Sequence, residues 1–490
     1  MLRRVFRPTQ ALAALAVAGS LLVPRAASAE VTLVDKDGWK VFITGRVQAF
    51  LNYNKGDGHP EPGVVDGNGA SVVLRGGGQL PADAYHEYPA ARTDANGVPL
   101  EPTAADRVGK IEEMRLRTGF VGNVLGFGIR KQINDTTDVL AYTAVTTYID
   151  STTRRKYLEV RPDWRESFLK ITAPWGSVTA GRFLTLFSRG ATEITYLYGF
   201  KYGLGWPGSV SSISGSGPGA GHVGFGVLGN GFGGGIAYAT PLLAGAQINV
   251  ALFDANSLVG SGQWERVKYP RAETEITFEK KLGGTGMFKL FANGAWQKVY
   301  NKETPANGTI LGAGYGGRLE VGPVHLGLAG HYGRGVGLDF ALQPSEAIWD
   351  SRMPDLKMRT FSGYYAQLMV SALKSLDLSA GAGMTAVKQN AEDKVDLTDD
   401  DGTPATPSCC DKNLDPANPT PKIDSVGFVT IKQQLGISAG ATIHVTENIH
   451  VALEYFRAMF QWYRPTPAVA GTGNPKQNLN VVNAGLTYTW

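Results

Sequence analysis

The sequence predicts an all-β protein, a 16-stranded antiparallel barrel that crosses a membrane. Apolar and polar residues alternate in stretches of about 10 to 20 residues, the period expected for strands with one apolar face. The connections between these stretches alternate between very short and very long. The chain also ends on such a stretch, VVNAGLTYTW, whereas chain termini usually fray unless something holds them. Its apolar face consists of Val482, Ala484, Leu486, Tyr488 and Trp490.

The first 29 residues have the three parts of a cleaved signal peptide. Arg3, Arg4 and Arg7 precede the apolar run 11–23, and the small residues Ala27-Ser28-Ala29 follow it. The run is shorter than the roughly 20 residues that a membrane-spanning helix needs. We therefore expect the mature chain to begin at Glu30 and residues 30–490 to form a single barrel domain.

The composition excludes some classes of protein. Without the four arginines of the signal peptide, 43 of the 47 basic residues remain against 43 acidic ones, so the mature chain is close to neutral. A basic surplus typical of nucleic-acid binding is therefore missing. Two cysteines cannot staple a fold of 490 residues, so backbone hydrogen bonds and packing must stabilise it.

Sixteen strands follow from the alternation, an even number that brings both ends of the barrel to the same rim. The strands are expected at 39–53, 112–133, 139–149, 163–173, 177–187, 222–240, 246–256, 271–282, 286–300, 309–321, 323–336, 359–373, 376–389, 426–445, 448–463 and 478–490. The segment 222–240 is rich in glycine and could also be split in two.

The connections fall into two sets that alternate along the chain. One set is short, as in PWG (174–176) and TEN (446–448). The other set is long and rich in Gly, Pro, Asp and Asn: 54–111, 188–221, 337–358 and 390–425. Repeated long loops count against a compact soluble domain, whereas an outer-membrane barrel has short periplasmic turns and long external loops.

The polar face of each strand is expected to line a water-filled channel, because a barrel in lipid turns its apolar face outward. In 271–282, for example, Ala272 and Ile276 share one face, and Glu273 and Glu275 share the other. The charged residues expected to face the channel are Arg46, Arg115, Arg117, Arg182, Glu273, Glu275, Lys289, Arg318, Lys432 and Glu454. Aromatic residues gather near strand ends, where interfacial girdles form. The alternative is a secreted all-β soluble protein.

Three stretches resemble the trimeric general porins of Gram-negative bacteria. They are the hairpin RESFLKITAPWGSVTAGRFLTLF (165–187), RTGFVG (117–122) leading to QINDTTDVLAY (132–142), and the last strand. The resemblance implies a homotrimer in the outer membrane that contacts lipid and lipopolysaccharide. It also implies that the barrel-assembly machinery recognises the terminal aromatic residue, here Trp490 in place of the usual phenylalanine.

The resemblance further implies that the loop after the fifth strand, 188–221, folds inward and constricts the pore. Arg182 matches the family's Gly-Arg position, and Arg117 matches the second-strand arginine. The loop carries one acid, Glu193, beside Arg189 and Lys201, which suggests a weak anion preference. Its aromatic residues could stack on sugar rings or wedge the loop against the wall: Tyr196, Tyr198, Phe200, Tyr202 and Trp206.

Other motifs carry no predicted chemistry. Ser438 in GISAG matches a nucleophile pattern but lies within an alternating strand, and His325 and His331 are better explained as wall residues than as metal ligands. The acidic segment 393–402 is expected to be a solvated external loop. Cys409 and Cys410 could bond to each other or pair elsewhere. No catalytic, cofactor-binding or metal-binding residue is predicted.

The sequence therefore predicts an outer-membrane porin for passive diffusion of small hydrophilic solutes and ions, and not an enzyme. The first alternative is a channel selective for sugars or small organic anions. A second alternative is an outer-membrane barrel hydrolase, which would need a Ser-His or Asp-His pair at a strand end.

Overall fold

The computed structural model describes 14 segments of the chain: 30–57, 110–118, 122–147, 162–194, 222–255, 268–283, 286–301, 305, 307–338, 341–342, 349–350, 357–389, 431–462 and 476–490. The expected signal peptide, most of the loop 54–111 and all of the loop 390–425, with Cys409 and Cys410, lie outside these residues, so those expectations remain predictions. None of the helices among the described residues is long and apolar enough to span a bilayer.

Strands make up most of the described chain, with one short helix, α2 (Arg189–Ile194). The strands are β1 (Val31–Lys36), β2 (Trp39–Asp57), β3 (Lys110–Arg117), β4 (Asn123–Asn134), β5 (Thr137–Thr147), β6 (Asp163–Ala173), β7 (Gly176–Leu184), β8 (Phe232–Ala239), β9 (Ala246–Phe253), β10 (Arg271–Leu282), β11 (Gly286–Tyr300), β12 (Asn307–Val321), β13 (Val324–Arg334), β14 (Trp349–Asp350), β15 (Lys357–Met358), β16 (Thr360–Leu373), β17 (Leu376–Lys388), β18 (Ile431–His444), β19 (Ile449–Trp462) and β20 (Lys476–Thr489).

The sheet closes into a barrel with 16 antiparallel strand positions, which confirms the predicted fold class. Each strand from β4 to β13 pairs with the next along the chain, β13 pairs with β16, and the pairing continues to β20. The last strand, β20, pairs with β2 and completes the ring. β3 and β4 pair with the two halves of β2, one after the other, so they share one strand position of the barrel. Together they correspond to the predicted strand 112–133.

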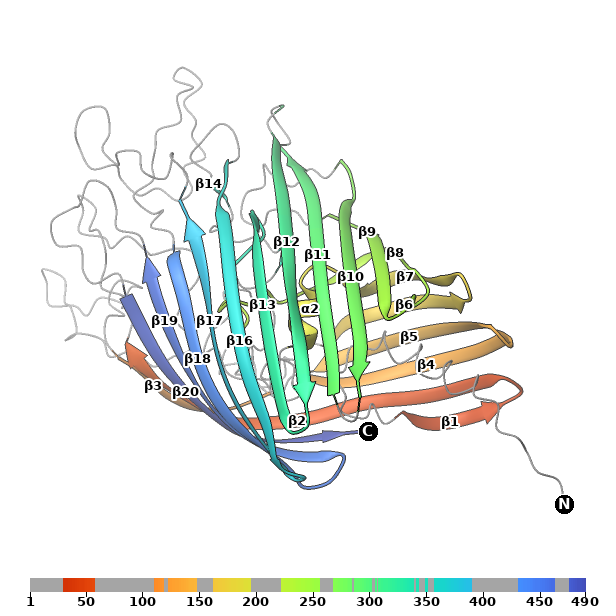
Figure 1. Cartoon of the computed structure of the whole chain (residues 1–490), viewed down its shortest axis with the longest axis horizontal. Helices are drawn as coiled ribbons and strands as arrows, with labels where there is room; N and C mark the ends of the chain where they lie inside the picture. The colour runs from red at the N-terminus through yellow and green to blue at the C-terminus, as the bar shows by residue number, and fades with distance from the viewer. Residues whose placement is uncertain are drawn as a thin grey trace, which may run out of the picture.

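Strand β1 was not expected from the sequence. It forms a hairpin with the start of β2, pairing with Trp39–Ile43, while β20 pairs with β2 from Arg46 onward. β1 therefore pairs with β2 on the same side as β20 and extends that strand position of the barrel past the C-terminus (Figure 1). All six of its residues are exposed, and an irregularity between Thr32 and Val34 interrupts the alternation over this short stretch.

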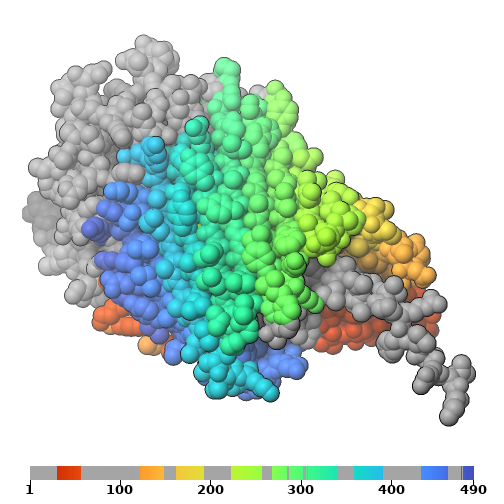
Figure 2. Space-filling model, viewed as in Figure 1, coloured from red at the N-terminus to blue at the C-terminus, as the bar shows by residue number. Residues whose placement is uncertain are grey.

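The two faces of the wall separate as the alternation predicts. Large apolar side chains such as Leu51, Leu252 and Leu328 are exposed on the outer face. Polar side chains such as Asn52, Gln367 and Asn483 are buried on the inner face. In the space-filling view, the side chains of β10 to β19 form a continuous outer wall (Figure 2). Since the backbone is paired around the ring, this apolar face is suited to contact hydrocarbon.

The predicted strand 222–240 is only partly correct. Strand β8 begins at Phe232, and every residue from His222 to Asn230 is buried away from the outer surface. This segment folds into the barrel because its side chains pack on the inner wall.

Candidate functional site

The chain leaves the wall after β7 and enters the lumen. We call the described part of this segment, residues 185–194 and 222–231, the inward loop. Its helix α2 contacts β11, β12 and β13 from inside the ring (Figure 1). Gly190 lies so close to the wall that a Cβ there would be 2.2 Å from Phe291 Cγ. Ala191 and Val227 share one apolar cluster with Phe291 and two other wall residues.

The second half of the inward loop lies against β16 to β19. The ring of Phe225 is centred 5.1 Å from that of Phe456 and 5.6 Å from that of Phe460. The Gly226 amide donates to Thr385 Oγ1 at 2.9 Å, and Gln434 Nε2 donates to the Gly224 carbonyl at 2.9 Å. The inward loop is thus fixed to walls far from its root between β7 and β8, which places it across the lumen.

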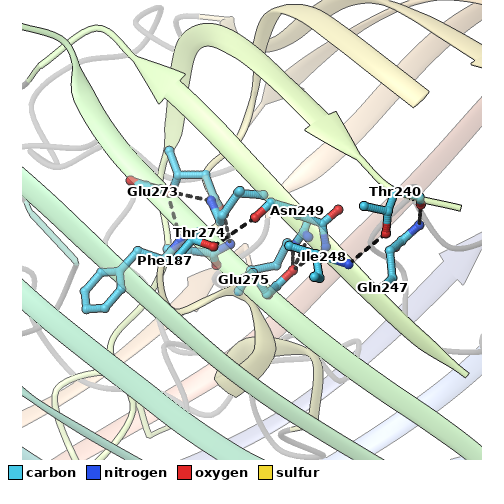
Figure 3. A network of polar contacts seen from close by, with 12 residues as sticks. Phe187, Thr240, Gln247, Ile248, Asn249, Glu273, Thr274 and Glu275 are labelled. Carbon is cyan, nitrogen blue, oxygen red and sulfur yellow. Dashed lines mark hydrogen bonds and ion pairs between the residues drawn. The ribbon is translucent and has the colours of Figure 1, made fainter. Parts of the chain in front are cut away.

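Two carboxylates of β10 hold the root of the inward loop. Glu273 Oε2 accepts hydrogen bonds from the backbone amides of Leu186 at 2.7 Å and Phe187 at 2.8 Å. Its other oxygen lies 2.7 Å from Arg271 Nε. Glu275 accepts from Arg189 Nε at 3.0 Å and also from Arg189 Nη2. Figure 3 shows both carboxylates directed toward the loop from adjacent inner positions.

Three cations form a row on another part of the inner wall, the part that β2, β4 and β6 contribute. The register aligns Lys40 on β2 with Arg130 on β4, and Arg130 through Leu140 with Lys170 on β6. With strands about 4.8 Å apart, the row spans roughly 14 Å of wall. Glu30 bridges two of its members, at 2.6 Å from Lys40 Nζ and 3.8 Å from Arg130 Nη2. We call Lys40, Arg130 and Lys170 the basic row.

An aromatic layer lies next to the basic row. Phe42 on β2 and Phe168 on β6 occupy the inner positions two residues along from Lys40 and Lys170. Tyr142 on β5 is in register with Phe168, and their rings are 5.6 Å apart. The charged groups of Lys40 and Arg130 each lie 5.6 Å from the centre of the Phe42 ring. Phe42 is fully buried, so this layer supports the cations and offers little open ring surface to a solute.

Several predicted channel residues can be placed. Arg46 lies on the inner face of β2, and its Nε donates to the Gly122 carbonyl at 3.4 Å. Arg115 and Arg117 occupy positions of β3 in register with Asn52 and Phe50, which face inward. Arg189 belongs to the inward loop. The side chain of Glu193 and the residues Tyr196, Tyr198, Lys201, Tyr202 and Trp206 lie outside the described part of the chain.

The prediction that Arg182 faces the channel is wrong. Arg182 pairs with Ser167 and Gly234 on the outer face of β7, while the next residue, Phe183, faces inward. The ring of Phe183 lies 5.1 Å from that of Phe253, in an apolar cluster beside the root of the inward loop. The inner wall is apolar here because it supports the loop, so the arginine takes the outer position.

Sequence reasoning missed the basic row, although one signal for it was present. The alternation that placed Arg46 inside also places Lys40 on the same face of 39–53. Arg130 and Lys170 share a level with Lys40 only through the register of four strands, which the sequence does not give.

The barrel seam contains Trp490. Its backbone exchanges two hydrogen bonds with Gly45 of β2, at 2.8 and 3.0 Å. Its indole stacks on Tyr488 at 5.6 Å and lies over Gly45, where a Cβ would be 2.2 Å from Trp490 Cζ2. The terminal aromatic residue therefore has a structural role in closing the ring.

A closed barrel of 16 antiparallel strands with an apolar outer face and a polar inner face is the architecture of outer-membrane barrels of the porin type. The outer membrane channel DcaP of Acinetobacter baumannii is similar in structure, with a TM-score of 0.59 and 11% sequence identity over 93% of this chain and 99% of that one. An anion-selective porin from Comamonas acidovorans has a TM-score of 0.52 and 11% identity over 92% of this chain and 100% of that one. No protein-family model and no curated protein sequence matches this chain.

Proposed function

We propose that this protein is an outer-membrane porin through which small hydrophilic solutes diffuse passively, with a weak preference for anions. Solutes would move down their gradients past the inward loop, and the charges on the inner wall would bias which ions enter. We further propose that the chain assembles as a homotrimer and that the barrel-assembly machinery recognises Trp490.

The proposed anion preference is supported by the inner wall, where basic side chains are more exposed to the lumen than acidic ones. The side chains of Glu273 and Glu275 are 0% and 1% exposed, because the inward loop covers them. In the basic row, the side chains of Lys40 and Arg130 are 29% and 21% exposed. Glu30 between them is 18% exposed, so these three groups together carry one net positive charge, and solutes would meet more positive than negative charge. The likeness to a porin named as anion-selective concerns the fold alone, and we infer the preference from this chain's own residues.

The reversal potential in a salt gradient across a planar bilayer tests this proposal. We expect the native channel to favour chloride over potassium. The variants Lys40→Gln and Lys170→Gln should each shift the reversal potential toward cation selectivity. Arg182→Gln removes a cation from the outer face and is the matched control, which should leave the reversal potential unchanged. A cation-selective native channel, or an equal shift in the control, would contradict the proposal.

A channel selective for small organic anions remains the second candidate. The basic row beside an apolar layer favours an organic anion over a sugar, because the buried ring of Phe42 offers no face for stacking. Such a channel would show conductance that an added organic anion blocks at saturating concentration, whereas a general diffusion pore would not.

A hydrolase is the third candidate, and one observation bears on it. His222 Nε2 of the inward loop lies 2.7 Å from Ser438 Oγ on β18. However, His222 is fully buried and Ser438 is 2% exposed, so a substrate cannot reach the pair. We propose that the pair fastens the inward loop to the wall. A fluorophosphonate probe should therefore leave Ser438 unlabelled in the folded protein.

A further inference from the structure

Three polar side chains from adjacent strands meet at the rim of the barrel that carries the short turns. Asp377 is near the start of β17, His444 ends β18 and His450 is near the start of β19. His444 Nδ1 lies 2.9 Å from His450 Nδ1, and His444 Nε2 lies 2.8 Å from Asp377 Oδ2. The two imidazole rings are 5.0 Å apart and nearly perpendicular. We call His444 and His450 the rim histidine pair.

The rim histidine pair faces the lumen. Asp377 is on the same face of β17 as the buried Thr385, His444 on the same face of β18 as Ser438, and His450 on the same face of β19 as Ala452. The side chain of His444 is 22% exposed, so water in the lumen can reach it, whereas His450 is only 3% exposed. The basic row lies on β2, β4 and β6, so the two features belong to different parts of the wall.

Asp377 determines which nitrogen of His444 carries the proton. A carboxylate accepts, so His444 Nε2 bears the hydrogen and Nδ1 keeps a lone pair. His450 Nδ1 then donates to that lone pair, and one proton lies between the two rings. If this proton moves to Nε2 of His450, two Nδ1 lone pairs face the same point.

This arrangement matches the way in which proteins bind transition metals. Two imidazole nitrogens that each lie about 2.0–2.1 Å from one ion are roughly 2.9 Å apart when the nitrogen–metal–nitrogen angle is about 90°. They are about 3.3 Å apart when that angle is tetrahedral. The observed 2.9 Å falls at the lower end of that range. A histidine ligand usually donates its other N–H to a carboxylate, as His444 does to Asp377. Imidazole is a preferred ligand of first-row divalent ions.

We propose that the rim histidine pair binds one divalent first-row transition ion through its two Nδ1 atoms, and that Asp377 orients His444 for this. Among the described residues no group of three or more His, Cys, Asp or Glu side chains is placed to hold one ion. The site therefore has two protein ligands, and water from the lumen completes the coordination. Such an open site binds its ion exchangeably, and this inference does not depend on the ion preference proposed above.

Copper provides a direct test, because its electron paramagnetic resonance spectrum reports the number of nitrogen ligands. We expect Cu²⁺ added to the folded protein in detergent to give a signal from one ion per chain with two imidazole nitrogens. His444→Gln and His450→Gln should abolish this signal. Asp377→Asn should weaken binding about 10- to 100-fold, as expected for an outer-shell partner. His325→Gln, which changes another inner-face histidine beside Glu320, is the matched control and should leave the signal unchanged.

A second measurement uses only the native protein, in case a variant fails to fold. Zn²⁺ should protect His444 from modification by diethylpyrocarbonate, as read by peptide mass spectrometry, while His325 stays reactive. A two-nitrogen copper signal that persists in folded His450→Gln protein would overturn the proposal. Equal modification of His444 with and without Zn²⁺ would overturn it as well.

Discussion

Single side chains fix the inward loop to the wall. The carboxylate of Glu273 accepts hydrogen bonds from two backbone amides of the loop and also balances Arg271. Charged acceptors form stronger hydrogen bonds than neutral ones, and a buried charge that loses its partner is costly. The geometry of the loop therefore depends on one carboxylate of β10.

Replacement of this carboxylate should loosen the loop. Glu273→Gln leaves Arg271 without its buried counter-charge and weakens both bonds to the loop amides. We expect a loss of roughly 3 kcal/mol in stability and larger, noisier single-channel conductance. Urea unfolding in detergent micelles and bilayer recording would measure the two effects. Glu279→Gln, at an exposed position of the same strand, is the control, and an equal effect there would contradict this role for Glu273.

The seam between the two ends of the chain depends on the lack of a side chain at Gly45. Gly45→Ala would place a Cβ about 2.2 Å from Trp490 Cζ2, so the indole would have to move. We expect a loss of about 1–3 kcal/mol, typical of overpacking, and a lower melting temperature in micelles. Gly234→Ala is the control, since a Cβ at that position of β8 meets nothing within 4 Å. Equal melting temperatures for the two variants would contradict this packing.

At the scale of elements, the inward loop behaves as a segment docked on a wall. Its second half is held by apolar contacts of Phe225 and by the bond from His222 to Ser438. Burial lowers the pKa of His222 to about 3 from its ordinary 6.5. The docked histidine is therefore neutral, while an undocked one would take up a proton below about pH 6.5.

Acid should consequently weaken the docking. Because the undocked state binds more protons between about pH 6.5 and 3, the stability of the docked loop is complete above pH 6.5 and falls as the pH drops through that range. At pH 5 the undocked population should rise by up to about 30-fold. Hydrogen exchange at the Phe225 and Val227 amides, corrected for intrinsic rates, would measure it. If exchange is unchanged at pH 5, or if it increases equally in His222→Gln, His222 is not the sensor.

The alternation in the sequence was enough to predict the wall elements but not the inward loop. All 16 predicted strands have a counterpart in the barrel, since the lipid-facing residues of strands such as 271–282 repeat every second position. The inward loop lies outside this pattern, because its apolar residues, such as Phe225, pack on the inner wall. Two predictions are wrong because the inner wall is apolar where it supports the loop. The strand expected at 222–240 begins only at Phe232, and Arg182 lies on the outer face.

At the scale of the whole molecule, the barrel combines an apolar exterior with a polar interior. This inverts the arrangement of a soluble protein, and it requires hydrocarbon outside and water inside. The inward loop then divides the wet interior, because it is fixed to β10 at its root and to β16–β19 at its far side. A channel function depends on this inversion more than on any single residue.

Site-directed spin labelling tests the inversion most directly. Single cysteines would be placed along β10 from 272 to 278 and along β13 from 325 to 331, in a Cys409→Ser, Cys410→Ser background reconstituted in lipid vesicles. We predict accessibility to oxygen at outer positions such as Ile276 and Leu328. Inner positions should instead favour a water-soluble nickel reagent over oxygen, or be shielded from both by the loop, so that the two faces alternate with a period of two. If outer positions are shielded from oxygen, those side chains are packed in a protein core, and the protein is not a membrane channel.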